Sequence, residues 1–253
     1  MDMTIFTVPR PFIGHFKVIQ RNAITSWTKL SPVPHVLVMG DDEGTEEFVK
    51  DLGVSYCPKV IRNELGTPTI DFLFHRAKEL SPHNIMAYVN ADIILFDDFM
   101  EATARVAAKF DDDFLIVGQR GDYGVGDPID FSNPNWRDAL KNKGGLHGVC
   151  GIDYFIFTRN LYDIIPPFAI GRTAWDNWLV WNPISRGKPV VDATGAIKII
   201  HQNHNYPSHC DPFTGPEAQE NRRLAGEDAG TGCFGYTSHA PWIINSEEIK
   251  RRN

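Results

Sequence analysis

One carboxylate interrupts an apolar run near the middle of the chain. Asp92 lies within residues 84–96, whose sequence is NIMAYVNADIILF. A charge is costly to bury unless it is paired or coordinates a metal ion. The pattern leaves two interpretations open: Asp92 binds a divalent metal ion, or it is a solvated aspartate in a turn or at a helix cap.

Three histidines follow a short apolar run later in the chain. His201, His204 and His209 all lie within residues 199–210. Imidazole together with carboxylate suits a divalent transition ion such as Mn²⁺, whose geometry keeps positions open for phosphate oxygens. These histidines are therefore candidate metal ligands, and the alternative is a set of ordinary surface histidines.

Two further acids lie in segments that suit a sugar or its acceptor. Asp176 stands between Trp175 and Trp178. Aromatic faces stack on sugar rings, and a carboxylate between them could accept a proton from an attacking hydroxyl group. Asp153 follows the glycine-rich residues 145–151, which could let the backbone approach a ligand closely. The structural alternatives are a helix cap at Asp176 with core tryptophans, and a tight turn before Asp153.

Composition and the absence of some motifs exclude other classes of protein. The chain has 253 residues, of which 42% are hydrophobic, enough for one large domain with a full core. The net charge is −7 and no run of lysine or arginine could track a nucleic-acid backbone, so we expect no nucleic-acid partner. The sequence contains neither a Walker A loop nor a G-x-G-x-x-G fingerprint, which argues against P-loop and dinucleotide-binding enzymes.

The cysteines and the hydropathy pattern bear on location. Cys57, Cys150, Cys210 and Cys233 lie far apart and form no C-x-x-C pair, so we interpret them as reduced thiols of a cytoplasmic protein. No stretch reaches the roughly 18 consecutive apolar residues that would cross a bilayer. We therefore expect no integral membrane segment in this sequence.

The elements that must position these residues alternate between strand and helix in the first half of the chain. This alternation predicts an α/β fold with a doubly wound, mainly parallel sheet. Asp92 would then emerge at the carboxyl end of a central strand, where ligands of open α/β sheets bind. The pattern predicts strands at residues 4–8, 36–39, 54–56, 85–90 and 114–118, and helices at 12–27, 45–52, 69–80 and 97–110.

The second half is less regular. Residues 119–145 are rich in Gly, Pro, Asp and Asn, which predicts a long surface loop. We expect the tail at 208–237 to be irregular and to wrap the domain or cover a site. Between these two segments, core patterns predict strands at 152–158, 190–192 and 197–201 and a helix at 174–181.

Taken in this order, the segments resemble the GT-A class of glycosyltransferases, and specifically its glycosyltransferase-2-like members, from the first strand to about Tyr206. In that class a D-x-D motif after the fourth strand binds the metal ion and the donor. The matching residues here are Asn90, Ala91 and Asp92, so the first acid is replaced by asparagine. The resemblance implies that Asn90 forms a hydrogen bond to ribose or phosphate, while Asp92 supplies the carboxylate ligand.

The resemblance also implies roles for other residues. A late histidine completes the metal site in this class, which corresponds to His201 or His204. The base of inverting members corresponds to Asp176, with Asp153 orienting the sugar or the acceptor. Donor contacts would come from the ends of the first strands, and the matching residues are Thr7, Pro9, Arg10, Asp41, Arg62 and Thr67.

The function implied is a transfer of a hexose or pentose from a nucleoside-diphosphate sugar, such as a UDP-sugar, to a carbohydrate or other hydroxyl acceptor. Mn²⁺ or Mg²⁺ would be the cofactor. Residues 1–253 would form a single catalytic domain, in which residues 1–118 bind the nucleotide and 119–253 bind the acceptor and complete the metal site. The sequence does not decide whether the anomeric configuration is inverted or retained, although an acid at position 176 favours inversion.

Three other functions remain open at this point. The first is a metal-dependent hydrolase that uses His201, His204 and His209 as ligands, although their spacing matches no known helical zinc signature. The second is a nucleotidyltransferase of the same architecture, against which the absence of an early glycine-rich phosphate loop counts. The third is a sugar-binding module without catalytic activity.

Overall fold

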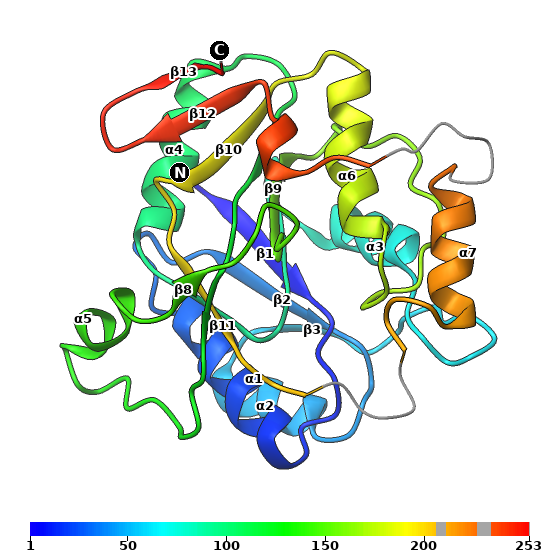
Figure 1. The fold of residues 1–253 in the computed structure, drawn as a ribbon. Helices are drawn as coiled ribbons and strands as arrows, with labels where there is room; N and C mark the ends of the chain where they lie inside the picture. The colour runs from blue at the N-terminus through cyan, green and yellow to red at the C-terminus, as the bar shows by residue number, and fades with distance from the viewer. Residues whose placement is uncertain (206–210, 227–233, 253) are drawn as a thin grey trace.

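The computed structural model describes residues 1–205, 211–226 and 234–252, and its centre is a large sheet (Figure 1). The nine described strands of this sheet follow the order β13-β12-β10-β6-β9-β4-β1-β2-β3. Their bounds are β1 Met3–Thr7, β2 His35–Met39, β3 Ser55–Cys57, β4 Ile85–Val89, β6 Leu115–Val117, β9 Tyr154–Thr158, β10 Val190–Gly195, β12 Trp242–Asn245 and β13 Ile249–Arg251.

Most neighbouring strands of the large sheet are parallel. β3, β2, β1 and β4 run in one direction, and β6, β10 and β12 are likewise parallel to one another. β9 is antiparallel to both of its neighbours, β4 and β6, and β13 is antiparallel to β12 at the edge. The predicted mainly parallel α/β sheet is thus confirmed.

Helices cover both faces of the sheet because side chains of each strand alternate between two cores. In β1, Met3 and Ile5 pack into one core while Phe6 packs into the other. The first core contains α1 (Gly14–Trp27), α2 (Thr45–Leu52) and α4 (Asp98–Lys109), and the second contains α3 (Ile70–Leu80) and α6 (Trp175–Ser185). This is the doubly wound arrangement that the sequence predicts.

A second, smaller sheet joins the middle of the chain to its last third. Its strands follow the order β5-β11-β7-β8, with bounds β5 Ile93–Leu95, β7 Gly121–Tyr123, β8 Gly145–Leu146 and β11 Ile199–Gln202. β11 is antiparallel to β5 and parallel to β7. Behind this sheet, Ile94, Phe96, Trp136 and Ile200 form a separate small core with α5 (Trp136–Lys141).

Two segments are more ordered than the sequence predicts. The stretch 119–145, expected as a surface loop, contributes β7, α5 and part of β8. The tail at 208–237, expected to be irregular, contains α7 (Pro216–Leu224), and the 3₁₀ turn η1 (Thr237–His239) begins at its last residue. α7 begins with proline and an acid and ends with two arginines, which favours a helix at both termini. Its composition is mostly polar, so it gives little apolar periodicity to detect.

The structure describes two of the four cysteines. Cys57 and Cys150 are free thiols, buried and exposed respectively, whereas Cys210 and Cys233 lie outside the described residues. No helix in the described part of the chain combines the length and apolar character needed to cross a bilayer.

The core contains a hydroxyl group with no hydrogen-bond partner among the described residues. Tyr154 in β9 is fully buried, and its Oη has no such partner. A Cβ added to Gly118, just after β6, would collide with this Oη and would lie 3.1 Å from the backbone nitrogen of Thr194. A buried, unsatisfied hydroxyl group lowers stability, and the glycine at position 118 makes room for it.

We predict that Tyr154→Phe raises the free energy of unfolding by about 1 kcal/mol, because it removes this unsatisfied group. Gly118→Ala should lower the free energy of unfolding by about 1–3 kcal/mol through overpacking. The double variant should recover part of that loss, as measured by urea unfolding. A loss of stability in Tyr154→Phe would show that the hydroxyl group has a partner in solution.

Candidate active site

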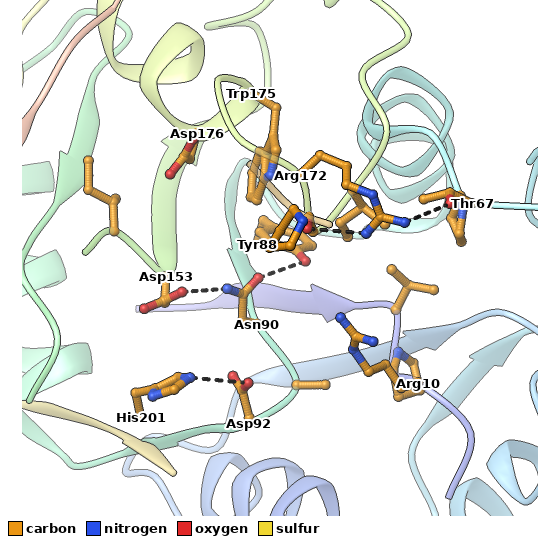
Figure 2. Close-up of a pocket in the computed structure, with 18 of the residues that line it drawn as sticks. Arg10, Thr67, Tyr88, Asn90, Asp92, Asp153, Arg172, Trp175, Asp176 and His201 are labelled. Carbon is orange, nitrogen blue, oxygen red and sulfur yellow. Dashed lines mark hydrogen bonds and ion pairs between the residues drawn. The ribbon is translucent and has the colours of Figure 1, made fainter. Parts of the chain in front are cut away.

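Most of the predicted site residues line one pocket at the carboxyl ends of the parallel strands. Its volume is about 570 Å³. Pro9 and Arg10 follow β1, Asn90 and Asp92 follow β4, and Asp153 immediately precedes β9. Because β1 and β4 are parallel neighbours, their carboxyl ends meet at one edge of the sheet. Figure 2 shows Asp92, Asn90 and Asp153 together at this edge.

Three of the lining residues form a group that could hold a metal ion. Asp92, His201 and His204 each offer one ligand atom, and these atoms lie within 4.8 Å of one another. His204 Nε2 lies 3.0 Å and His201 Nε2 lies 3.5 Å from the same oxygen of Asp92, Oδ2. The other oxygen, Oδ1, is buried and has no hydrogen-bond partner among the described residues. One carboxylate and two imidazoles suit a divalent transition ion.

The two histidines control the charge of Asp92. Burial opposes ionisation of this carboxyl group, but its hydrogen bonds with His201 and His204 outweigh that effect and hold its pKa well below the usual range. Burial also lowers the pKa of His201, yet the contact with Asp92 prevails and raises it above the ordinary value. Asp92 is therefore a carboxylate at neutral pH, as a metal ligand must be.

A second carboxylate, Asp153, is held from two sides. Asn90 Nδ2 donates to its Oδ1 at 2.5 Å, and Arg120 Nη1 donates to its Oδ2 at 2.9 Å. Tyr88 Oη donates to the amide oxygen of Asn90 at 3.0 Å (Figure 2). The amide group of Asn90 thus has a protein partner at each end, and the hydrogen bond to ribose or phosphate that the family resemblance implies stays a prediction.

Asp176 lies in the first turn of α6, beside Trp175. Burial raises the pKa of Asp176 to about 7, the nearby charge of Asp153 adds to the rise, and the backbone amide of Asn177 opposes it. Its Oδ1 is buried without a hydrogen-bond partner among the described residues. Ala174, directly before the helix, has a φ of 84°, which a residue with a Cβ adopts only at a cost. This turn brings Trp175 and Asp176 to the pocket wall.

The residues predicted to contact the donor separate into two groups. Pro9, Arg10, Arg62 and Thr67 line the pocket, and Arg10 lies over the ring of Phe16. The pocket-lining residues do not include Thr7, which is buried in β1, or Asp41, whose side chain is 68% exposed. The neighbouring Asp42 lines the pocket instead and accepts from Arg62 at 2.9 Å.

The third predicted histidine, His209, lies outside the described residues, so its role remains a prediction. On the opposite wall, Arg172 forms a buried ion pair with Glu217 of α7 at 2.5 Å. Glu217 also accepts from Asn63 at 2.6 Å, in the segment that leads from β3 to α3. These contacts fix α7 beside the pocket.

Sequence reasoning missed a set of polar residues carried by the small sheet. Arg120, Asp122 and His147 lie near the metal-ligand group, and His147 Nδ1 is 2.6 Å from Asp122 Oδ2. Arg120 Nε donates to Asp122 Oδ1 at 2.9 Å. The only available signal was an acid and a base separated by one residue, within a stretch that resembles a loop. These residues lie near His201 because β7 pairs with β11, and such pairing between distant segments produces no local pattern in the sequence.

No protein-family model and no curated protein sequence matches this chain significantly. Among solved structures, it resembles residues 1–349 of S. aureus TarS in complex with UDP-GlcNAc. The TM-score is 0.57 at 12% identity, over 92% of this chain and 67% of that one.

Two further structures show the same likeness. GalNAc-T7 with UDP, GalNAc and Mn²⁺ gives a TM-score of 0.54 at 12% identity, over 88% of this chain and 48% of that one. Glucosyl-3-phosphoglycerate synthase from Mycobacterium tuberculosis, in complex with Mg²⁺ and UDP, gives 0.52 at 12% identity over 90% of this chain and 79% of that one. The chain therefore has the GT-A fold of nucleotide-sugar glycosyltransferases, as its sequence resemblance predicts.

The raised pKa of Asp176 leads to a prediction about stability. An unfolded aspartate ionises near its ordinary pKa of 3.8, whereas the folded protein keeps the proton up to about pH 7. Between these values the folded state binds more protons than the unfolded state, so the contribution of Asp176 to stability falls as the pH rises.

We predict that Asp176→Asn, which removes this ionisation, is more stable than the wild type at pH 8 by up to about 4 kcal/mol. The difference should shrink as the pH falls toward about 4. Urea unfolding across this pH range measures it, and Asp111→Asn, at an exposed bend, is the matched control. A difference that does not change with pH would mean that Asp176 ionises normally.

Proposed function

We propose that this protein transfers a sugar from a nucleoside-diphosphate sugar to a hydroxyl acceptor. The observation that carries the proposal is the convergence of Asp92, His201 and His204 with two further carboxylates in one pocket of a GT-A sheet. A mere sugar-binding module would not need a buried carboxylate oxygen without a partner, as at Asp92, or an acid whose pKa is raised to about 7, as at Asp176.

We infer that the donor carries UDP and that the cofactor is Mn²⁺ or Mg²⁺. All three structures described above contain UDP or a UDP-sugar, and two of them contain Mn²⁺ or Mg²⁺. When bound at Asp92, His201 and His204, a divalent ion would supply positive charge against the diphosphate leaving group. The two imidazole ligands favour Mn²⁺ over Mg²⁺, which prefers oxygen ligands.

The remaining residues suit the transfer step. Asp176 would take the proton of the acceptor hydroxyl as that oxygen forms a bond to the anomeric carbon, while the bond from that carbon to the diphosphate breaks. Its pKa near neutrality is close to optimal for a general base, and the pKa is set by burial. Asp153, fixed by Asn90 and Arg120, would orient a hydroxyl group of the sugar or the acceptor. This assignment of roles favours inversion at the anomeric carbon.

We predict that UDP raises the melting temperature only when Mn²⁺ or Mg²⁺ is present. At about 100 times the dissociation constant, binding stabilises the folded state by about 2.7 kcal/mol, which is roughly 5–10 °C for a chain of this size. Differential scanning fluorimetry with UDP, GDP and their sugar conjugates measures the shift. Equal shifts in the presence of a chelator would contradict the metal-bridged donor.

The control for this experiment is Asp92→Asn, which keeps the size of the side chain and removes the charge. We expect the variant to fold and to lose the metal-dependent part of the shift. Asp111→Asn, at an exposed bend outside the pocket lining, is the matched variant that should keep the full shift. Normal metal-dependent binding by Asp92→Asn would make Asp92 a structural residue.

We predict that Asp176→Asn lowers kcat for sugar transfer by about 10²–10⁴-fold while UDP binding is unchanged, because a general base acts only in the transition state. In the wild type, kcat/KM should rise with pH through an apparent pKa near 7, as Asp176 loses its proton. Asp176→Asn should lack this rise. Transfer is followed with a radiolabelled UDP-sugar, and release of free sugar without an acceptor would indicate a hydrolase. Transfer at the wild-type rate by Asp176→Asn would reject the base assignment.

A further inference from the structure

A carboxylate on the small sheet lies behind one of the candidate metal ligands. β7 and β11 are parallel, and their register pairs Asp122 directly with His201. Asp122 Oδ1 lies 3.3 Å from His201 Nδ1, while His201 Nε2, on the other side of the ring, lies 3.5 Å from Asp92 Oδ2. The imidazole of His201 therefore stands between two carboxylates. Asp122 is not part of the group whose ligand atoms lie within 4.8 Å of one another.

We propose that Asp122 is a positioning residue that holds His201 with its Nε2 directed at Asp92 and at a divalent metal ion. The inference rests on the metal site of the proposed function and adds the residue that orients one ligand of that site. Asp122 would contact neither the metal ion nor the substrate.

The reason lies in the chemistry of a neutral imidazole, which carries one N–H group and one lone pair. A metal ion needs the lone pair, so if Nε2 is the ligand, the proton must be on Nδ1. A carboxylate next to Nδ1 stabilises this tautomer and makes the ring more basic. Asp122 is the residue that the strand register places at Nδ1 of His201.

Asp122 is itself held in place, as an orienting group must be. Its Oδ1 accepts from Arg120 Nε at 2.9 Å, and its Oδ2 lies 2.6 Å from His147 Nδ1. Both oxygens thus have a fixed partner, and the carboxylate plane is defined before a ligand arrives. The contact to His201 has ion-pair distance but lacks hydrogen-bond alignment, and a small rotation about the side-chain bonds of His201 would be needed to align it.

The Nδ1 atoms of His201 and His204 lie near different groups. Nδ1 of His204 is 3.4 Å from the backbone carbonyl oxygen of Asn205, the residue next to it in the chain. His201 lies within a strand, and its orienting group comes from a distant segment through strand pairing. Of the two candidate metal ligands, His201 is therefore the one on which a variant at Asp122 should act, which makes the proposal testable.

The experiment measures Mn²⁺ binding without substrate, by isothermal titration calorimetry. Asp122→Leu removes the charge and the acceptor, whereas Asp122→Asn keeps an acceptor and removes only the charge. We expect Asp122→Leu to weaken Mn²⁺ binding by about 10–100-fold, the usual cost of losing such an orienting partner, and Asp122→Asn to lie between it and the wild type. Circular dichroism and melting temperature establish that each variant is folded.

A double-mutant cycle separates orientation of His201 from a general structural effect. In the His201→Ala background, Asp122→Leu should change the Mn²⁺ dissociation constant by no more than about twofold, because the residue through which Asp122 acts is absent. Electron paramagnetic resonance of bound Mn²⁺ should show the nitrogen coupling of one imidazole lost in Asp122→Leu.

Several outcomes would overturn the proposal. If folded Asp122→Leu binds Mn²⁺ as the wild type does, with both nitrogen couplings, Asp122 does not orient His201. The same holds if Asp122→Leu still weakens binding strongly in the His201→Ala background. Both outcomes leave the proposed function intact as long as Asp92→Asn loses Mn²⁺. If Asp92→Asn also binds Mn²⁺ normally, the metal site itself is wrong and both proposals fail together.

Discussion

The architecture of the pocket depends on the cost of burying the carboxylate of Asp92. This residue stands between β4 and β5, in an otherwise apolar run, so its charge has to be compensated locally. The compensation comes from His201 and His204, more than 100 residues away in the chain. They reach Asp92 because β11 pairs with β5 in antiparallel register. Strand pairing in the small sheet therefore brings both imidazoles to the carboxylate of Asp92.

From Asp92, basic and acidic side chains contact one another in alternating order across the pocket. His201 lies next to Asp122, Arg120 bridges Asp122 and Asp153, and Asn90 closes the path beside β4. Each member of this network has partners of opposite charge or complementary hydrogen-bonding type. Such a network fixes side-chain positions before a ligand binds, which electrostatic stabilisation of a transition state requires. It also connects the candidate metal ligands to the wall that carries Asp176.

Local patterns predicted the elements that hold Asp92 but not the network around it. The strands near Asn90 and the helices beside them have regular apolar spacing, and a lone acid in such a run is visible. β7 and β8 are only two or three residues long and rich in glycine, so the local pattern around Arg120 and Asp122 predicts a loop. Asp42 lines the pocket, whereas the sequence pattern predicted the neighbouring Asp41. Sequence pattern does not fix which side chain after a strand points toward the pocket.

The two carboxylates on the far side of the pocket differ because their surroundings differ. Asp153 accepts hydrogen bonds from Arg120 and Asn90. Asp176 Oδ1 is buried and has no such partner in the described part of the chain, and burial raises the pKa of Asp176 to about 7. A carboxyl group whose pKa lies near neutrality is suited to exchange a proton near neutral pH. The charge of Asp153 contributes to that rise, so the residue proposed to orient the substrate also tunes the residue proposed to act as the base.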